Sequence, residues 1–456
     1  MKIILLNVVG QALSTRGDSN LENASLAYLG GALKAAGFEF SVVDNVLDGR
    51  SPEALVAELP ESDNILLAVH LMGRNWVDGL NSFLRAVEEQ KHAVRYLVVG
   101  GQYASLYADE ILADCPAIDM LVRGEGEEIL LRIATLMASG EFDALSQLDD
   151  KLFYQADLAA IPNPYHYSLA MEVPPSITIW TSRGCIGKCA FCMTPEFHRH
   201  FDQYMRRRPC TRVAEEIVSL HDATGRTFFQ FGDDNFVPLD KQEQQSITDM
   251  LEGIKARIPE FTFSIYAKPD LVDLQLFSHW KTLGLKHTFL GIESFNDTFL
   301  RYLGKTNRCT DNLKALEIHN QLSLRYTIGY IMVSPFFEIE DIQGELQMLQ
   351  QHVLDTPVIP ASLFNAPSNC LLVYNKTRLY RKLKAEGVIS AEGYDHFYDI
   401  YPYRINPTVS IYLQAIKQYT SEVTGSIDME AAQQALFIAQ DLAEAAPLHL
   451  MAAQER

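Results

Sequence analysis

Three cysteines stand close together near the middle of the chain, at Cys185, Cys189 and Cys192. Their C-x3-C-x2-C spacing places three thiolates on one short loop, directly after an apolar, strand-like run over residues 177–184. Three thiolates can hold three of the four irons of a [4Fe–4S] cube. The fourth iron then has no protein ligand and is open to a small molecule. The spacing therefore predicts a cluster that takes part in chemistry as well as in electron transfer.

This loop resembles the cluster motif of the radical S-adenosylmethionine (SAM) superfamily, in which an aromatic residue usually precedes the last cysteine, as Phe191 does here. The resemblance implies that the open iron binds the amino and carboxylate groups of SAM, and that one electron splits SAM to give a 5′-deoxyadenosyl radical. A zinc site completed by His198 or His200 is the alternative. Zinc prefers four closed ligands, often as two short Cys/His pairs, and no second pair lies nearby in the sequence.

Two acidic elements resemble SAM-binding parts of the same superfamily. An F-x-D-D-x-F run resembles that of cobalamin-fused members and implies that Asp233 or Asp234 contacts the SAM amino group, although either residue could instead cap a helix. A G-x-E-S element implies that Glu293 and Ser294 lie beside the ribose and methionyl part of SAM, and Ser294 could equally cap the next helix. Lys268 and Arg208 are candidates for the SAM carboxylate by location only.

The elements that must position these residues alternate between strands and helices over residues 173–390. Strands are expected at 176–182, 226–232, 261–267, 286–291, 325–333 and 358–366. Six such units resemble the partial (β/α)6 barrel of radical SAM enzymes, which places catalytic groups at the C-terminal ends of the strands. Cys370 lies near the last strand and is, by position, a candidate catalytic hydrogen donor or acid, although a free cysteine is more often a small buried hydrophobe.

Residues 1 to about 150 show the same alternation in shorter units. Strands are expected at 3–8, 38–43, 64–69, 96–99 and 120–122, with helices near 24–37, 52–59, 75–90, 103–113 and 126–139. This order predicts an α/β domain with a doubly wound parallel sheet, whose ligands bind beyond the carboxyl ends of the strands. Small and polar residues follow two strands: Gly100, Gly101, Gln102, Gly124, Glu125 and Gly126. Glycine allows close approach to a ligand, although either turn alone is equally typical of simple turns.

These turns, together with residues 23–33, resemble the Rossmann-like cobalamin-binding domain that precedes many radical SAM cores, and the resemblance covers most of residues 1–145. It implies cobalamin as a further cofactor, bound by the two turns. Many such domains supply a cobalt-ligating histidine after the first strand, but residues 7–12 contain none. This implies either a cobalt without a protein imidazole or a domain that has lost the cofactor. His70 is a candidate substitute, although a lone histidine there is more often packed or solvated.

Two further segments complete the organisation. Prolines break regular structure within residues 151–172, which are therefore expected to form a linker. Residues 391–456 are expected to form a small helical C-terminal domain, either as a cap over the substrate cavity or as a packing or dimer surface. Aromatic residues crowd positions 394–403, and no cysteine follows Cys370, so this tail cannot hold a second cluster.

The composition limits the partners and the location. A formal net charge of -20 disfavours nucleic acid. No apolar stretch reaches the roughly 18 residues of a membrane span, and no signal peptide is expected at the start. The cysteine count of 7 is odd, which argues against a disulfide scaffold and, with an oxygen-sensitive cluster, favours the cytoplasm.

Together these features favour a cobalamin-dependent radical SAM methyltransferase that acts on an unactivated carbon of a small metabolite. Its electrons would come from a flavodoxin- or ferredoxin-like donor. A second hypothesis is a radical SAM dehydratase, deoxygenase or ring-rearranging enzyme in which the cobalamin domain is silent or structural. A third is a non-catalytic cobalamin or redox sensor, against which the near-complete set of SAM-site residues argues.

Overall fold

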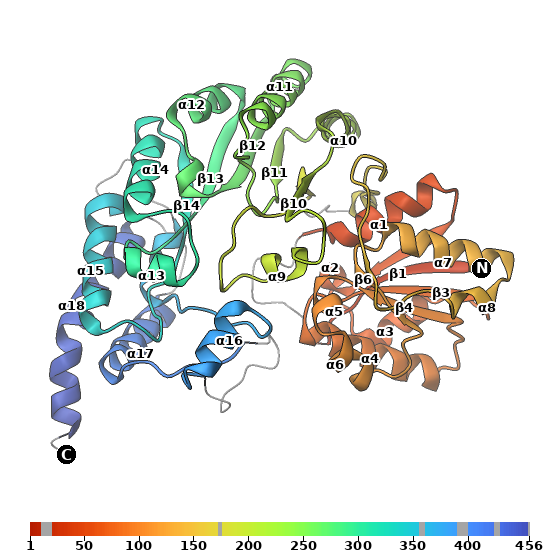
Figure 1. The fold of residues 1–456 in the computed structure, drawn as a ribbon, viewed down its shortest axis with the longest axis horizontal. Helices are drawn as coiled ribbons and strands as arrows, with labels where there is room; N and C mark the ends of the chain where they lie inside the picture. Colours follow the sequence, from red (N-terminus) through yellow and green to blue (C-terminus); the bar gives the residue numbers. More distant parts are fainter. Residues whose placement is uncertain (11–20, 172–175, 355–360, 390–399, 424–428, 455–456) are drawn as a thin grey trace. The chain divides into compact units, whose positions relative to one another are not determined.

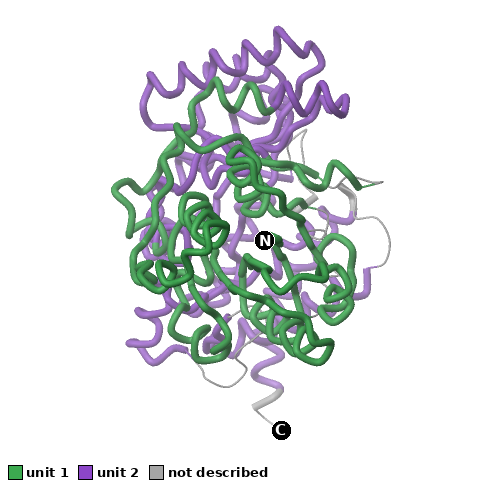
Figure 2. Tube along the Cα trace, turned by 90° about the vertical axis from the view of Figure 1, so that its right-hand side faces the viewer, with its two compact units in different colours: residues 1–178, 196–216, 395–399 green, residues 179–195, 217–394, 400–456 purple. Residues whose placement is uncertain are grey.

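The structure is a computed structural model that describes residues 1–10, 21–171, 176–354, 361–389, 400–423 and 429–454. The chain divides into two compact units (Figure 2). The first consists mainly of residues 1–178 and 196–216, and the second of residues 179–195, 217–394 and 400–456. The segment that follows the cysteine loop therefore packs with the first unit, although it lies within the sequence of the second.

A five-stranded parallel sheet in the order β2-β1-β3-β4-β5 forms the centre of the first unit (Figure 1). Its strands are β1 Lys2–Asn7, β2 Phe40–Asp44, β3 Ile65–His70, β4 Tyr96–Gly100 and β5 Met120–Leu121. Strands β1 and β3 are buried along almost their whole length, as expected for central parallel strands covered on both faces. The predicted doubly wound domain is confirmed.

Helices cover both faces of this sheet (Figure 1). The longer ones are α1 Ala24–Ala35, α4 Arg74–Glu89 and α7 Glu127–Ser139, and the shorter ones are α2 Asn45–Asp48, α3 Pro52–Leu55, η1 Val56–Glu58, α5 Gln102–Leu106, α6 Ala108–Asp114 and α8 Phe142–Leu145. Alternate residues of β1, including Ile3 and Leu5, pack into one core with Leu26 of α1 and Ile133 of α7. This follows from the period of two along a strand.

The segment predicted as a linker is tied to the first unit by regular hydrogen bonds. Its β7 strand (Phe153–Tyr154) pairs with β6 (Arg123–Gly124), and the 3₁₀ helix η2 spans Tyr167–Ala170. The amide of Tyr165 donates to the carbonyl of Ala27 over 2.7 Å. β10 (Met205–Arg207) and the first part of α10 (Cys210–Thr224) also belong to this unit.

The second unit contains another five-stranded sheet, in the order β14-β13-β12-β11-β8 (Figure 1). Its strands are β8 Thr178–Ile179, β11 Phe228–Phe231, β12 Thr262–Ala267, β13 Leu285–Glu293 and β14 Arg325–Tyr330. The four strands from β11 to β14 run parallel. One face is buried by aromatic packing, in which Phe236 contacts both Phe231 and Trp280.

Helices follow the strands of this sheet in turn. They are α11 Lys241–Arg257, η3 Pro269–Leu271, α12 Leu274–Leu283, α13 Asp297–Tyr302, α14 Cys309–Gln321, α15 Ile339–Leu349 and η4 Gln350–Leu354. Short elements β9 Ser182–Gly184 and α9 Thr194–His198 flank the cysteine loop. The expected barrel-type alternation of strand and helix is confirmed.

The prediction of a strand at 358–366 is wrong for residues 361–366, which are the part of this run that the structure describes. Residues Ala361–Phe364 form the 3₁₀ helix η5, and Ala366–Ser368 form a second one, η6; residues 358–360 lie outside the described part of the chain. The predicted run contains Pro360, and a proline argues against a central strand because it lacks the amide hydrogen that the ladder needs. The chain rejoins the sheet only by an isolated bridge between Cys370 and Val333.

The C-terminal region is helical, as expected. Residues 391–456 contain α17 Pro407–Glu422 and α18 Met429–Gln454, and α18 packs against α15, α17 and η5. The helix α16 (Arg378–Ala385) precedes them and lies within the range predicted for the core. The Tyr412 hydroxyl donates to the carbonyl of Pro367 over 2.9 Å. Of the crowded aromatic residues, Tyr394, Phe397 and Tyr398 lie outside the described ranges. Among the helices that the structure describes, none has the length and apolar character needed to span a membrane.

Candidate functional site

The cysteine loop is entered through a turn that Asp233 holds. Asp233 follows β11, is fully buried, and accepts from the amide of Thr181 at 3.1 Å and from its hydroxyl at 2.6 Å. The hydroxyl of Ser182 donates to the same carboxylate. A buried carboxylate with three donors fixes the backbone that leads into Cys185.

Backbone contacts from two distant segments hold the loop itself. The amide of Ala190 donates to the carbonyl of Leu303, over 2.7 Å, and the amide of Leu379 donates to the carbonyl of Ala190, over 2.8 Å. The guanidinium of Arg378 donates to the carbonyl of Lys188. The loop is therefore clamped between the end of α13 and the start of α16.

The three thiols lie on one loop and are all partly buried. The sulfur of Cys185 lies 3.3 Å from the position that a Cβ would take at Gly187, so a side chain there would crowd it, whereas the Cys189 sulfur lies at an ordinary contact distance of 3.7 Å. Burial raises the pKa of Cys185 and of Cys192 to about 11, and the mutual charges of the thiols add to this rise. In a cube each iron takes its own sulfur, so the thiols need not meet at one point. The loop fits a cluster held by three cysteines.

A mononuclear zinc site finds no such support. Within the described ranges, no three Cys, His, Asp or Glu side chains gather closely enough to ligate one metal ion. His200 stacks on Phe153 with ring centroids 4.0 Å apart, and His198 packs beside Phe197 and Phe201. Both rings are thus placed by aromatic packing.

Asp234 has a different position from its neighbour Asp233. Its carboxylate reaches the surface of the site, yet it lies deep enough that loss of water raises its pKa to about 6, with the charge of Asp233 adding to the effect. A nearby cation would stabilise the ionised form of a carboxylate that has lost part of its hydration. Of the two predicted candidates, Asp234 is the one that stays exposed, because the carboxylate of Asp233 accepts from donors inside the protein.

Glu293 ends β13 in a strained conformation. Its φ is 65°, in the left-handed region, and the pairing of β13 with β14 shifts register between Gly291 and Glu293. The ammonium of Lys305 lies 3.3 Å from the Glu293 carboxylate and donates to the carbonyl of Gly291 over 2.7 Å. Strain of this kind at a strand end is typical of functional sites, because the surrounding structure must impose it.

Ser294 belongs to a buried hydrogen-bond network. It is fully buried, and its hydroxyl donates to Glu345 of α15 over 2.5 Å. The amides of Phe295 and Asn296 donate to the same carboxylate, as does the hydroxyl of Tyr330. Ser294 thus supports the turn after Glu293, while Asn296 is the residue that caps α13.

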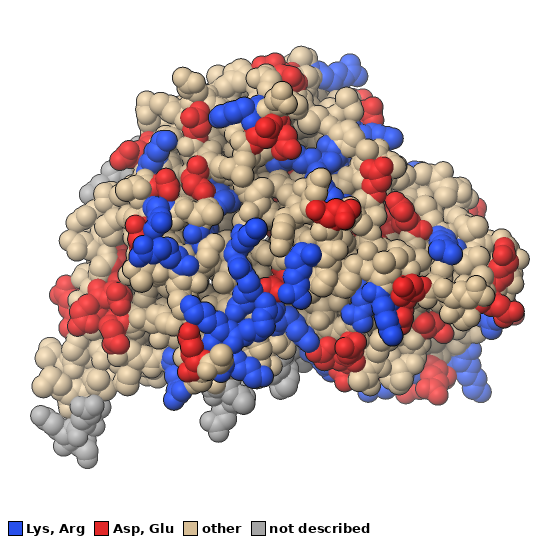
Figure 3. Space-filling view, viewed as in Figure 1, with Lys and Arg blue, Asp and Glu red and all other residues tan. Residues whose placement is uncertain are grey.

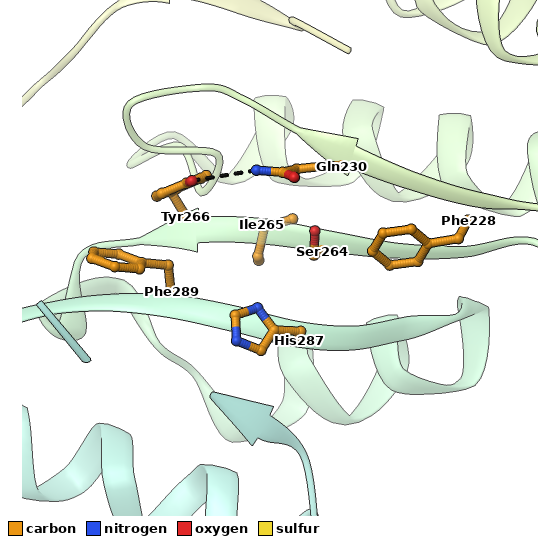
Figure 4. Close-up of a pocket in the computed structure, with 7 residues that line it drawn as sticks. All are labelled: Phe228, Gln230, Ser264, Ile265, Tyr266, His287 and Phe289. Atoms are coloured by element: carbon orange, nitrogen blue, oxygen red, sulfur yellow. Dashed lines mark hydrogen bonds between the residues drawn. The ribbon is translucent and has the colours of Figure 1, made fainter. Parts of the chain in front are cut away.

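A pocket of about 240 Å³ opens on the sheet of the second unit, on the face opposite the aromatic packing around Phe236 (Figure 4). The side chains that line it come from β11, β12 and β13 and are Phe228, Gln230, Ser264, Ile265, Tyr266, His287 and Phe289. Gln230 donates to the hydroxyl of Tyr266 over 3.3 Å, and His287 lies 2.8 Å from the Thr327 hydroxyl. The sequence analysis did not identify these residues. Six of them form three pairs, each two residues apart on one strand, and this spacing places both members of a pair on the same face of the sheet.

The remaining candidates of the second unit are only partly exposed. The thiol of Cys370 donates to the carbonyl of Ser368 over 3.5 Å, and burial raises its pKa, so it is protonated at neutral pH. Lys268 lies 3.3 Å from Asp270 and also donates to Thr306. Phe191 is half-buried within the cysteine loop.

Arg208 lies in the first unit, where internal partners surround its guanidinium. It forms an ion pair with Glu216 at 2.6 Å and donates to the hydroxyl of Tyr28 at 2.8 Å and to Asn163 at 3.0 Å. Next to it, His166 lies between two carboxylates, 2.7 Å from Glu22 and 3.4 Å from Glu216. These buried charges join the predicted linker to the body of the first unit.

Polar residues gather at the carboxyl ends of β1, β2 and β3. The amide of Asn7 donates to Asp44 over 2.9 Å, and Asp44 also accepts from Tyr167 over 2.6 Å. His70 ends β3, and its Nδ1 lies 2.9 Å from the side-chain amide of Asn23. This is the sheet edge at which such folds bind ligands.

Ser105 brings the two predicted glycine turns together. Its hydroxyl donates to the carbonyl of Gly101 and accepts from the amide of Gly124, at 2.7 and 2.9 Å. Gly101 has a φ of 113°, and a Cβ there would lie 2.7 Å from the His70 ring. Gly100 is half-buried and Gln102 is exposed.

Glu125 of the second turn is buried and engaged within the protein. It accepts from the amide of Ala156 at 2.7 Å and pairs with Arg206. A Cβ at Gly124 would lie 2.3 Å from the carbonyl of Tyr154, and one at Gly126 would press on Leu29. These residues pack β6 against the segment that follows it.

Comparisons with known proteins agree with this geometry. Residues 180–349 match the Radical SAM superfamily. A relative in Synechocystis sp., anaerobic magnesium-protoporphyrin IX monomethyl ester cyclase, is 25% identical over 395 residues, which is 80% of this chain and 75% of that protein.

Two solved structures share the fold. The cobalamin-dependent SAM radical enzyme OxsB, solved with aqua-cobalamin, superposes with a TM-score of 0.78 at 16% identity, covering 97% of this chain and 72% of that one. The radical SAM methyltransferase TsrM of Kitasatospora setae, solved with cobalamin and a [4Fe–4S] cluster, gives a TM-score of 0.66 at 15% identity and covers 86% and 76%. At this identity the likeness establishes the fold alone.

Proposed function

We propose that this chain, whose residues 180–349 match the Radical SAM superfamily, is a radical SAM enzyme that transfers a methyl group from cobalamin to an unactivated carbon of a small molecule. The observation that carries the proposal is the pairing of two units in one chain: a parallel-sheet unit with a polar carboxyl edge, and a unit whose loop offers three thiols at the edge of its own sheet. Cys185, Cys189 and Cys192 would hold a cluster there, which would supply the electron that splits SAM.

The residues around the cysteine loop would have two roles in SAM binding: some would contact SAM, and others would position the residues that do. Asp234 offers a carboxylate to the SAM ammonium, and Glu293 offers one to the ribose hydroxyls, kept in place by Lys305. Asp233 and Ser294 are fully buried and act as positioning residues, because their partners lie within the protein. Preorganised groups of this kind avoid a cost of rearrangement when the ligand binds.

Cobalamin would lie at the carboxyl edge of the first sheet. The turn at Gly100, Gly101 and Gln102 is partly exposed there, and Glu125 would act indirectly by holding the second turn, from Gly124 to Gly126. The fold shared with OxsB and TsrM, both solved with cobalamin, supports this assignment.

The pocket on the second sheet suits a small substrate or part of one. Its aromatic walls, Tyr266 and Phe289, favour a flat apolar group, while Gln230 and His287 offer hydrogen bonds. In the alternative reaction without methyl transfer, Cys370 is proposed as a hydrogen donor to a substrate radical, because its thiol is protonated at neutral pH and half-buried at the sheet edge. If so, Cys370→Ala should lower product formation while SAM cleavage continues, whereas equal losses of both would contradict this role.

The first test is anaerobic reconstitution with iron, sulfide and hydroxocobalamin, followed by desalting and absorption spectroscopy. Near-stoichiometric cobalamin beside a [4Fe–4S] signal, and transfer of label from the SAM methyl group into product, are expected. Cluster-dependent SAM cleavage in protein that retains no cobalamin would overturn the methyl-transfer proposal.

A second candidate function keeps the radical and omits methyl transfer. The relative in Synechocystis sp. is named as a cyclase, and the loop after β1 lacks the histidine that many cobalamin domains use. A dehydratase, deoxygenase or ring-rearranging reaction with a silent cobalamin domain would give product without methyl label.

A further inference from the structure

The helix α16 carries an exposed basic surface on a strongly acidic protein. Arg378, Arg381, Lys382 and Lys384 are all exposed, in a chain of net charge -20. At 100° per residue these four side chains cover an arc of about 160° on the helix. The buried Leu379 and Leu383 lie opposite the middle of that arc. Lysine and arginine side chains gather over α16 in the space-filling view (Figure 3).

The same helix contacts the cysteine loop directly. The amide of Leu379 donates to the carbonyl of Ala190, and the guanidinium of Arg378 donates to the carbonyl of Lys188. Ala190 and Lys188 are the two neighbours of Cys189 in the chain. Lys188 is itself exposed and adds a positive charge at this border. A route from the basic surface to a cluster ligand thus crosses one hydrogen bond and one peptide unit.

Aromatic side chains lie beside the positive charges. The ammonium of Lys382 lies 3.4 Å from the centroid of the Tyr302 ring, and Tyr302 in turn packs against the partly exposed Phe336. Aromatic residues and arginine are enriched in surfaces that bind other proteins. The surface therefore offers both long-range attraction and short-range contact.

We propose that this surface, defined by Lys188, Arg378, Arg381, Lys382 and Lys384, is where a small acidic protein with a low-potential flavin or iron–sulfur centre docks to reduce the cluster. Charge selects the place: an acidic carrier is repelled by a chain of this net charge except where basic groups gather. A carrier bound at this surface would lie close to the cluster, because α16 contacts the loop that carries the cluster ligands. The inference rests on the proposed function, because only a cluster that must be reduced needs such a partner.

The test compares two charge-reversed variants of the reconstituted holoenzyme. Lys382→Glu/Lys384→Glu changes the basic surface, whereas Lys241→Glu/Lys314→Glu makes the same change in net charge at exposed positions on α11 and α14. The affinity for an acidic bacterial flavodoxin is measured at low and high salt. The rate of SAM cleavage is measured with reduced flavodoxin and, separately, with dithionite.

The α16 variant is expected to lose at least about tenfold in flavodoxin affinity and in flavodoxin-driven rate at low salt, with little change when dithionite is the reductant. The control variant should match the unaltered enzyme. Unchanged flavodoxin binding by the α16 variant, or an equal loss in the control, would overturn the docking site. Loss of dithionite-driven cleavage in the unaltered enzyme would instead count against the proposed function.

Discussion

The side-chain amide of Asn23 donates to Nδ1 of His70 at 2.9 Å, at the carboxyl edge of the first sheet. The orientation of this amide is fixed, because the Asn23 oxygen accepts from the amide of Leu26 at the start of α1. Burial lowers the pKa of His70 to about 4, so the ring is neutral. With Nδ1 accepting, the single ring proton lies on Nε2. His70 therefore lacks the free nitrogen lone pair that a cobalt ligand needs.

We expect cobalamin to bind without coordination by His70. His70→Ala should retain at least about half of the bound cobalamin. The EPR spectrum of the Co(II) form should not change when histidine is labelled with ¹⁵N, which distinguishes an imidazole ligand from the base of cobalamin itself. A nitrogen splitting that responds to histidine labelling and disappears in His70→Ala would disprove this.

The neighbours Asp233 and Asp234 should respond differently to the same substitution. Asp234→Asn removes a charge that faces the site, so SAM affinity should fall by about 10–100-fold, the equivalent of a charged hydrogen bond of about 1.5–3 kcal/mol, with little change in stability. Asp233→Asn removes an acceptor from buried donors and should lower the free energy of unfolding by about 1–3 kcal/mol. Isothermal titration with SAM and thermal unfolding measure the two effects, and equal behaviour of both variants would contradict the division of roles.

Glu345→Gln should loosen the turn that follows Glu293. The carboxylate of Glu345 accepts from two backbone amides and two hydroxyls, and an amide can accept on only one of its two heavy atoms. A loss of about 1–3 kcal/mol in stability is expected, together with weaker SAM binding. Glu340→Gln, at an exposed position of the same helix, is the control and should leave both unchanged. Normal thermal stability of Glu345→Gln would show that the network contributes little.

The stability of the first unit should fall as pH rises from about 6.5 to about 9 because of His166. Burial alone would lower the pKa of His166, but its hydrogen bonds to Glu216 and Glu22 raise it to about 9. The charged ring thus stabilises the fold fully below its unfolded pKa of 6.5, and this contribution is lost as pH rises through 9.

The matched variants for this prediction are His166→Gln and His279→Gln. His279 is exposed and pairs with Glu252, so its loss should not alter the pH profile. His166→Gln should lower the Tm at pH 6.5, by about 2–4 °C for each kcal/mol of stability lost. It should also make the Tm fall less steeply between pH 6.5 and pH 9. A pH profile of unfolding that is the same in His166→Gln and the unaltered protein would refute the assignment.

The fold was largely predictable because its signals are local. Periodic apolar runs gave nearly all strands of both sheets, and these signals survive because parallel strands are buried along their length. The failure at 358–366 is also local in origin, since Pro360 lies within that run and proline is not tolerated in a central strand. The expected linker contains few strand or helix signals, and only tertiary bonds such as that between Tyr167 and Asp44 fix it to the first unit.

The sequence by itself determined the cysteine loop and the acidic strand ends, because ligand spacing within one loop is a property of neighbouring residues. Only the tertiary structure decided which acid faces the site. Asp233 finds its donors 52 and 51 residues away, at Thr181 and Ser182, which leaves Asp234 as the accessible one. Ser294, Glu125 and Arg208 were likewise assigned by distant partners. Burial and hydrogen bonding of a side chain depend on residues that folding brings beside it, and no pattern around the residue itself contains that information.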